Sequence, residues 1–217
     1  IAVVYVTGAI VSGESSEPGL LGGSSMAGAD TIVRQLNDAK EDKSVKAVVL
    51  RVDSPGGSAF ASEDIWRAVE NVKKSGKPVV VSMGGVAASG GYYVSAGATA
   101  IYAEPTTITG SIGVYSGKFN TEKLFETIGI QVEEETRGRH ASLYTTSRPW
   151  DEMERKKMGE MVEDTYDRFK DRVGVGRKLS AEEVEKVARG RVWSGEKAKE
   201  MGLVDDLGGL FEAIERA

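Results

Sequence analysis

The sequence predicts an α/β fold built around a largely parallel β-sheet. Short runs rich in β-branched and aromatic residues alternate with longer segments whose apolar residues recur at helical spacing. Most of the short runs are apolar at consecutive positions, which is typical of parallel strands covered on both faces by helices. We therefore expect βα units, with helices flanking the sheet.

The expected elements follow one another along the whole chain. Strands are predicted at residues 1–6, 46–52, 78–83, 99–103 and 130–133. Helices are predicted at 29–43, 61–75 and 119–129, and a long helix begins after Asp151, which forms a capping pair with Glu154. From Ser180 onward we expect short helices around one last strand. The Gly- and Ser-rich segment 11–27 and the segment 136–150 are expected to be loops, either mobile or facing a substrate.

Length and composition restrict the possible functions. The 217 residues fit one α/β domain, so we expect a single domain over residues 1–217. The formal net charge of −5 argues against nucleic-acid binding, which depends on clustered Lys and Arg. The absence of cysteine excludes disulfides, thiolate catalysis and cysteine metal sites. With one histidine and scattered acidic residues, we expect no metal site and no cofactor.

One hydroxyl stands among very small residues in the stretch V86-A-A-S-G-G-Y-Y93, which follows a predicted strand. Another predicted strand ends in R51-V-D-S-P-G-G57, and consecutive glycine amides can hold an anionic oxygen. The C-terminal ends of parallel strands share one edge of the sheet, so we expect Gly56, Gly57 and Ser89 to converge there. The amide of Gly90, at a helix start, would favour an oxyanion beside Ser89. The alternative is that these small residues only allow close helix packing.

Catalysis by Ser89 requires a base that accepts its proton. His140 is the only histidine of the chain, so a Ser-His-Asp triad must use it or not exist. A single histidine in a polar loop is usually a solvated surface group. The residues alone therefore leave the identity of the base open.

Four motifs, in order, make this sequence resemble the signal peptide peptidase A family. They are R-V-D-S-P-G-G-S, V-V-V-S-M-G-G-V-A-A-S-G-G-Y-Y, T-I-T-G-S-I-G-V and G-R-V-W-S-G-E-K-A-K-E-M-G-L-V-D-D-L-G-G. The likeness covers essentially the whole chain. It implies the Clp protease and crotonase fold. It also implies a serine endopeptidase that cleaves residual signal peptides or other membrane-derived peptides.

The resemblance also implies a role for individual residues. Ser89 would be the nucleophile, and a lysine would replace histidine as the general base. Ser111, in the T-G-S-I-G motif, would help to hold that lysine. Gly57 of the Pro-Gly-Gly turn would supply an oxyanion amide, and we assign Ser54 and Gly56 of the same turn to substrate binding.

The lysine itself is missing from the place where the resemblance puts it. Single-length family members carry it in a segment similar to S-G-x-H-K, whereas this chain has R137-G-R-H-A141, with Ala141 at the lysine position. In double-length members the lysine comes from the N-terminal half and the serine from the C-terminal half. This chain, which starts inside an apolar run, resembles such a C-terminal half. Lys118, the nearby lysine after T-G-S-I-G, is expected to be solvated rather than catalytic.

The expected partners follow from the missing base. We expect peptide substrates, a lysine supplied by an N-terminal homologous half or a neighbouring subunit, and a homo-oligomer. We also expect membrane association through a segment absent from this chain, with the catalytic domain on the periplasmic or extracytoplasmic side. The alternatives are a catalytically silent structural half and a crotonase-like acyl-binding domain. No basic cluster suited to a nucleotide phosphate adjoins the glycine turns, which argues against acyl-CoA binding.

Overall fold

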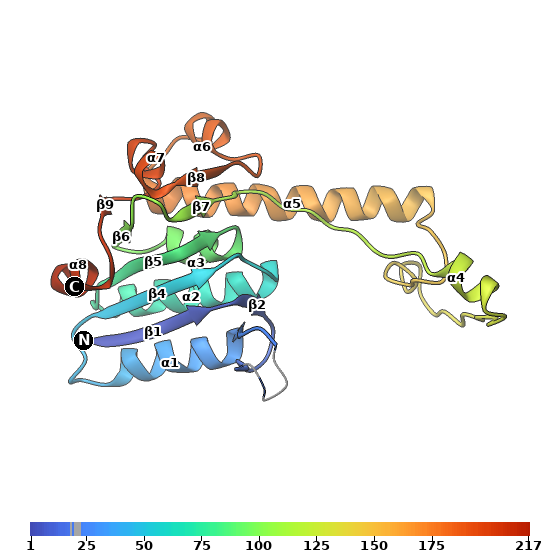
Figure 1. The fold of residues 1–217 in the computed structure, drawn as a ribbon, viewed down its shortest axis with the longest axis horizontal. Helices are drawn as coiled ribbons and strands as arrows, with labels where there is room; N and C mark the ends of the chain where they lie inside the picture. Colours follow the sequence, from blue (N-terminus) through green and yellow to red (C-terminus); the bar gives the residue numbers. More distant parts are fainter. Residues whose placement is uncertain (18, 20–22) are drawn as a thin grey trace. The chain divides into compact units, whose positions relative to one another are not determined.

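The computed structural model describes residues 1–17, 19 and 23–217 (Figure 1). The chain divides into two compact units. Unit 1 contains residues Ile1–Gly113 and Asp167–Ala217, and unit 2 contains Val114–Tyr166. The single domain over residues 1–217 stays a prediction.

Within the described residues, unit 1 is built on a seven-stranded sheet. Its main path runs in the order β1 (Ala2–Thr7), β4 (Val48–Ser54), β5 (Val79–Ala88), β6 (Ala100–Ala103) and β9 (Asp206–Leu207), and all neighbours on it are parallel. Strand β7 (Ile108–Gly110) pairs parallel with β5, and β8 (Val192–Ser194) pairs antiparallel with β7. The largely parallel sheet and four of the five predicted strands are therefore confirmed.

Strand β5 changes its partner along its length. Val80–Ser82 pair with β6, whereas Val86–Ala88 pair with β7. Between these parts, a Cβ atom added to Gly84 would lie only 2.8 Å from the carboxyl carbon of Asp53. The Asp53 carboxylate accepts a 3.1 Å hydrogen bond from the Val86 amide. Asp53 thus joins β4 to the second part of β5, which leads directly to Ser89.

Helices cover the sheet on both faces over its central strands. Helices α1 (Ala29–Glu41), α2 (Ala59–Lys74) and α3 (Gly90–Ala96) pack in sequence, with α2 in contact with both of the others (Figure 1). Helix α8 (Leu210–Arg216) packs over Val49 and Val80. Side chains alternate between the faces of a strand, so Val48 and Leu50 point away from α8, and both are fully buried. This arrangement confirms the predicted α/β class.

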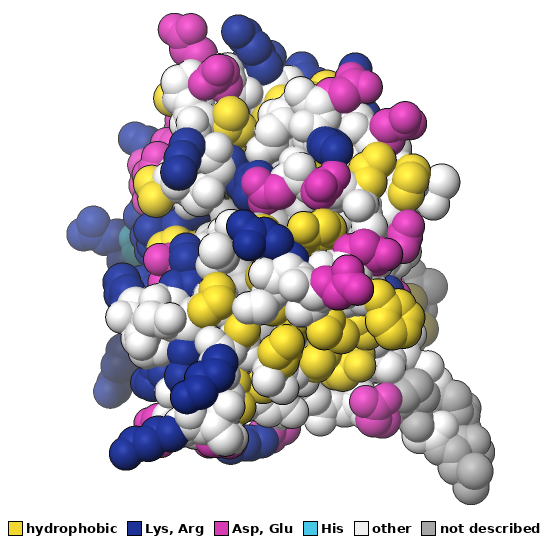
Figure 2. Space-filling view, turned by 90° about the vertical axis from the view of Figure 1, so that its left-hand side faces the viewer, with side chains coloured by type: hydrophobic (Ala, Val, Ile, Leu, Met, Phe, Trp, Pro, Cys, Tyr) yellow, Lys and Arg dark blue, Asp and Glu magenta, His cyan; other side chains and the backbone are white. Residues whose placement is uncertain are grey.

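Strand β1 is covered on one face only, whereas the sequence predicts strands that are covered on both faces. Val4 and Val6 are buried, but Val3 and Tyr5 between them are exposed. Phe211 of α8 is also exposed, and Figure 2 shows hydrophobic side chains gathered on the side of the molecule where both chain ends lie. Only one face of β1 is therefore buried within the described part of the chain.

The C-terminal part of unit 1 contains more strand than expected. Helix α6 (Ala181–Val187) precedes β8, helix α7 (Gly195–Glu200) follows it, and β9 comes before α8. Two short strands thus replace the single one predicted after Ser180. Each pairs with a part of the main sheet, β8 with β7 and β9 with β6.

The N-terminal loop segment is bounded by two short strands. Strand β2 (Ala9–Val11) pairs parallel with β3 (Met26–Gly28), so the ends of the predicted loop 11–27 are ordered against each other. Residues 18 and 20–22 of that prediction lie outside the described residues.

In unit 2 the prediction of a strand at 130–133 is wrong, because the structure has no strand at these described residues. The helix predicted at 119–129 is present but shorter, as α4 (Glu122–Thr127). Gly129 has a φ of +74° and lies just beyond the end of this helix. The Ile130 amide donates to the Phe125 carbonyl at 2.9 Å, which closes the helix in the manner of a Schellman motif. Ile130 and Val132 are each 49% exposed, so these β-branched residues have no sheet to join among the described residues.

The long helix α5 (Glu152–Arg177) contains residues of both units. Its predicted capping pair is confirmed, because the Glu154 amide donates to the Asp151 carboxylate and the Asp151 amide donates to the Glu154 carboxylate, at 2.7 and 3.0 Å. Within the described residues, no helix is both long enough and apolar enough to cross a bilayer.

Candidate active site

Ser89 lies in the sharp turn between the end of β5 and the start of α3. Its backbone has φ 51° and ψ −118°, a conformation that residues other than glycine rarely adopt. The Ser89 amide donates to the Gly110 carbonyl at 2.9 Å, and its carbonyl accepts from the Tyr93 amide at 2.8 Å. These bonds from β7 and α3 hold the strained turn in place. Ser89 is half-buried, so the residue is partly accessible to solvent.

The Pro-Gly-Gly turn after β4 packs directly against Ser89. A Cβ atom added to Gly56 would lie 2.8 Å from the Ser89 Cβ and 2.7 Å from the Gly90 amide nitrogen. One added to Gly90 would lie 3.2 Å from the Gly57 amide nitrogen. The predicted convergence of the two glycine stretches is therefore confirmed. The small residues are needed because two backbone segments meet here.

Two backbone amides in this contact are available to a ligand. The Gly56 amide is occupied, since it donates to the Ser54 hydroxyl at 3.1 Å, and Ser54 is fully buried. Gly90 is the first residue of α3, and the first amides of a helix have no partner within it. Among the described residues, neither the Gly57 amide nor the Gly90 amide donates to a protein acceptor. Both nitrogens lie beside Ser89, which is the arrangement that an oxyanion needs.

Strand β2 clamps the turn from the other side, which the sequence did not predict. The Ile10 amide donates to the Gly56 carbonyl at 2.9 Å, and the Ser58 amide donates to the Ile10 carbonyl at 2.8 Å. A Cβ atom added to Gly57 would lie 2.1 Å from the Ile10 carbonyl oxygen. The sequence signal that could have indicated this contact is the short apolar run around Ile10, which the structure shows to be buried.

Ser111 follows β7, and the residue before it is hydrogen-bonded to the Ser89 backbone. Gly110, the residue before it, accepts the hydrogen bond from the Ser89 amide. Ser111 itself has a φ of 49°, and its amide donates to the Arg191 carbonyl at 2.7 Å. Ser54, Gly56, Gly57, Ser89, Gly90 and Ser111 thus all lie on unit 1.

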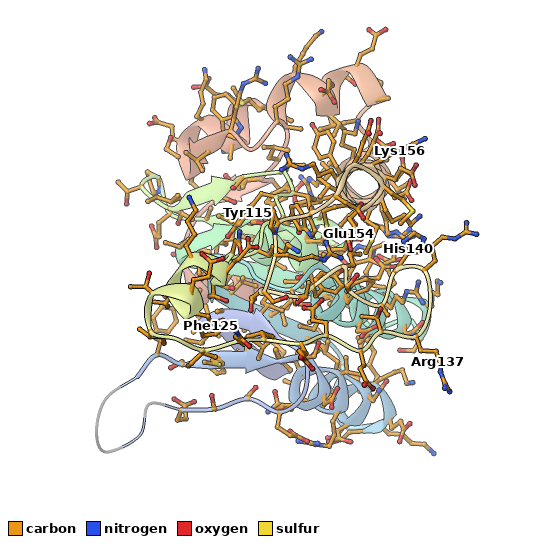
Figure 3. The ribbon with its side chains drawn as sticks, turned by 90° about the vertical axis from the view of Figure 1, so that its right-hand side faces the viewer. Tyr115, Phe125, Arg137, His140, Glu154 and Lys156 are labelled. Carbon is orange, nitrogen blue, oxygen red and sulfur yellow. The ribbon has the colours of Figure 1, made fainter. Side chains whose placement is uncertain are left out.

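The residues weighed as sources of a base lie on unit 2. Ala141 and His140 are exposed, and Figure 3 shows His140 on its loop. Lys118 was expected to be solvated, but its Nζ is buried and has no hydrogen-bond partner among the described residues. It lies 5.4 Å from the centroid of the Trp150 ring, so the aromatic face replaces part of the water around the cation. The solvated interpretation of Lys118 is therefore wrong.

The loop that contains Ala141 is anchored by one buried carboxylate. Glu154, which is labelled in Figure 3, is 1% exposed. It accepts hydrogen bonds from Arg148 at 2.8 Å and from the Ser142 hydroxyl at 3.0 Å. The hydrogen bonds from Arg148, Asp151 and Ser142 hold the pKa of Glu154 at about 2, well below its usual value. Segment 136–150 lacks helix and strand, as predicted, but its second half is tied to the start of α5.

A family model confirms the relationship that these motifs indicate. The model of Peptidase family S49 matches residues 71–217, which contain Ser89 and Ser111. The chain belongs to peptidase family S49. A Clp protease model matches residues 20–109 of this S49 chain, which confirms the Clp protease-like fold.

Several curated proteins are similar to this S49 chain. Protease 4 of Haemophilus influenzae is 45% identical over 100% of the chain. The chloroplastic serine protease SPPA of Arabidopsis thaliana is 40% identical over 99% of it, and a putative signal peptide peptidase SppA of Enterococcus faecium is 38% identical over 83%. The chain spans 34%, 31% and 53% of the lengths of these three proteins. The first two relatives are thus about three times as long as the S49 chain described here.

The S49 site is built from serine hydroxyls and backbone amides. Among the described residues, no group of three or more His, Asp or Glu side chains is placed to hold a metal ion. The chemistry that this geometry supports is nucleophilic attack with stabilisation of an oxyanion.

Proposed function

We propose that this chain is the serine-bearing domain of an endopeptidase that cleaves residual signal peptides or other membrane-derived peptides. The observation that carries the proposal is the pair of available amides, at Gly57 and Gly90, beside Ser89 in an S49 chain. The name of the Enterococcus faecium relative, a putative signal peptide peptidase, supports the substrate class.

In this mechanism the Ser89 hydroxyl attacks the scissile carbonyl while a neutral base accepts its proton. The resulting oxyanion accepts hydrogen bonds from the Gly57 and Gly90 amides, which are already in place before the reaction. When the tetrahedral intermediate collapses, the base returns the proton to the leaving amine and Ser89 remains acylated. Water, deprotonated by the same base, then releases the acyl group. Ser54 supports these steps by holding the substrate-facing turn through the Gly56 amide.

The base in this proposal is a lysine from an N-terminal homologous half or a neighbouring subunit of a homo-oligomer, because Ala141 provides none. Ser111, beside the Ser89 turn, would accept a hydrogen bond from that lysine. A lysine acts as a base only when neutral, so its pKa must fall from about 10.4 to between about 7 and 8. The shift corresponds to roughly 4 kcal/mol of differential desolvation, which a covered cleft can supply.

Lys118 is the alternative base within the chain. Its buried Nζ, without a hydrogen-bond partner among the described residues, is the observation that favours it. Its contact with Trp150 belongs to unit 2 and supports a structural role instead.

The proposed substrate also implies where the complete protein acts. Residual signal peptides are membrane-derived, so we propose that the complete protein is membrane-associated through a segment outside this chain, with the catalytic domain on the periplasmic or extracytoplasmic side. The length of the relatives leaves room for such a segment.

The test uses the complete protein and a fluorogenic peptide that contains a signal-peptide core. We expect Ser89→Ala to abolish turnover and Lys118→Ala to leave it largely unchanged. A large loss in Lys118→Ala, with the thermal stability unchanged, would assign the base to this chain. Full activity in Ser89→Ala would favour a catalytically silent structural half, and a crotonase-like acyl-binding domain would instead bind a thioester without hydrolysing peptides.

A further inference from the structure

A buried carboxylate in unit 1 gathers three donors from three helices. Glu63 of α2 is 8% exposed. It accepts hydrogen bonds from the Tyr93 hydroxyl of α3 at 2.6 Å, from Arg172 of α5 at 2.7 Å, and from Arg67 at 2.8 Å. Two arginines and a phenol therefore compensate the buried negative charge.

Tyr93 connects this cluster to the nucleophile. It lies one helical turn after Ser89, and its amide donates to the Ser89 carbonyl at 2.8 Å. Its side chain is 3% exposed, and its ring packs against Phe169 of α5 with 4.7 Å between the centroids. One residue is thus bonded through its backbone to the catalytic turn and through its hydroxyl to Glu63.

Helix α3 depends on such contacts, because a helix of seven residues has little stability of its own. Its first turn contains both the Ser89 carbonyl and the Gly90 amide that faces the Pro-Gly-Gly turn. A small rotation of α3 would move the nucleophile and one oxyanion donor together. Displacements of about 1 Å at a reacting group can cost about 10²-fold in rate.

The protonation states of Glu63 and Tyr93 allow the hydrogen bond between them to persist at neutral pH. Burial alone would raise the pKa of Glu63, but hydrogen bonds from Arg172, Tyr93 and Arg67 lower it to about 2. Burial and the bond to Glu63 raise the pKa of Tyr93 above its usual value. Glu63 therefore stays an acceptor and Tyr93 a donor at neutral pH.

We propose that Tyr93 and Glu63, braced by Arg172, are positioning residues that orient α3 so that Ser89 and the Gly90 amide face the Pro-Gly-Gly turn. This inference rests on the proposed function of Ser89. None of the three residues needs to touch the substrate for this role.

The chain contains a matched control for the Tyr93 hydroxyl. Tyr92 is the preceding residue of α3 and is fully buried, but its hydroxyl donates to the Leu203 carbonyl at 2.8 Å and does not contact Glu63. Tyr92→Phe and Tyr93→Phe therefore delete the same atom from neighbouring buried positions of one helix. Only the second change removes a bond to the proposed cluster.

The test measures kcat, KM and the thermal midpoint of the complete protein in both variants. For Tyr93→Phe we expect kcat to fall by about tenfold or more with KM within about twofold, because orientation affects the transition state more than binding. For Tyr92→Phe we expect a similar fall in the thermal midpoint and a kcat close to wild type. Equal kcat in the two variants would overturn the inference.

A second variant covers the case in which Tyr93→Phe fails to fold. Arg172 is partly exposed and lies over the Trp66 ring at 4.1 Å, so Arg172→Met keeps much of the packing and removes both hydrogen bonds to Glu63. We expect its kcat to fall with KM little changed, and a wild-type kcat would contradict the proposal. Ser89→Ala is measured in parallel. If it retains activity, the proposed function itself fails, whereas its inactivity beside fully active Tyr93→Phe and Arg172→Met rejects only the positioning role.

Discussion

The backbone of Ser89 is held in a conformation that costs of the order of 1–3 kcal/mol for a residue with a side chain. Its φ of 51° is maintained by hydrogen bonds to β7 and α3. Such strain is typical of a residue whose exact placement matters more than its contribution to stability.

Ser89→Ala tests the nucleophile at this scale. The change removes one hydroxyl and keeps the Cβ atom, so we expect kcat for a peptide to fall by about 10³-fold or more, with little change in the thermal midpoint. The measurement is turnover by the complete protein after removal of any contaminating protease. Retention of a tenth of the wild-type rate would reject Ser89 as the nucleophile.

Gly57→Ala tests whether the Pro-Gly-Gly turn supplies an amide to the oxyanion. The new Cβ atom would meet the backbone of Ile10 and push the turn away from β2, so we expect kcat to fall by about 10²–10³-fold together with a lower thermal midpoint. Gly159→Ala is the control, because nothing lies within 4 Å of a Cβ atom at that helical position. If Gly57→Ala lowers stability but spares kcat, the turn is only structural.

Prediction of individual residues from the sequence succeeded where a general rule of sheet geometry applied. Ser89 and the Pro-Gly-Gly turn could be brought together because parallel strands end at one edge of the sheet. The clamp from Ile10 depends on a contact between distant parts of the chain. The burial of Lys118 depends on Trp150, and no hydrophobic periodicity links these two residues.

At the scale of elements, the contact of α2, α3 and α5 at Glu63 gives a pH dependence. The pKa of Glu63 is lowered in the folded state, so its contribution to stability is complete above about pH 4.5 and is lost as the pH falls toward 2. We expect Glu63→Gln to destabilise the complete protein at pH 7 and the difference from wild type to shrink below pH 4.5. Thermal midpoints across this range measure it, with Glu196→Gln as the exposed control. A constant difference would mean that the charge of Glu63 plays no part.

The loop between residues 142 and 151 gives a second prediction for an element. Glu154→Gln removes the charge that holds Arg148, and we expect faster hydrogen exchange at 142–151 with no change in 46–52. Lys156→Gln, at an exposed position of the same helix, is the control. Unchanged exchange in the loop would show that its turns hold it without Glu154.

The elements that the sequence mispredicted share one cause. Residues 130–133 have the β-branched composition of a strand, but Gly129 ends α4 and the Ile130 amide bonds back to that helix. Strands β2 and β3 were not predicted, and one strand was predicted after Ser180 where the structure has β8 and β9; each of these short strands pairs with a neighbouring strand. Pairing partners are a property of the fold, and residue propensity does not report them.

At the scale of the whole molecule, the question is whether the chain is active alone. If another domain or subunit supplies the lysine, we expect these 217 residues to hydrolyse a fluorogenic peptide negligibly and the complete protein to be active. Ala141→Lys places a lysine on the loop that Glu154 anchors and is expected to give the chain weak activity. Circular dichroism of each sample controls for folding. Full activity of the unmodified chain would end the shared-site hypothesis.

The change of partner within β5 separates the half of the strand that leads to Ser89 from the half that pairs with β6. The first half of the strand lies between β4 and β6, whereas the half that leads to Ser89 lies between the end of β4 and β7, which is itself joined at its other edge to the short β8. Partial unfolding can therefore begin at β7 and β8 while the central strands stay paired. Mild denaturant should then inactivate the peptidase before the bulk of its secondary structure is lost, and dilution should restore activity without refolding of the core.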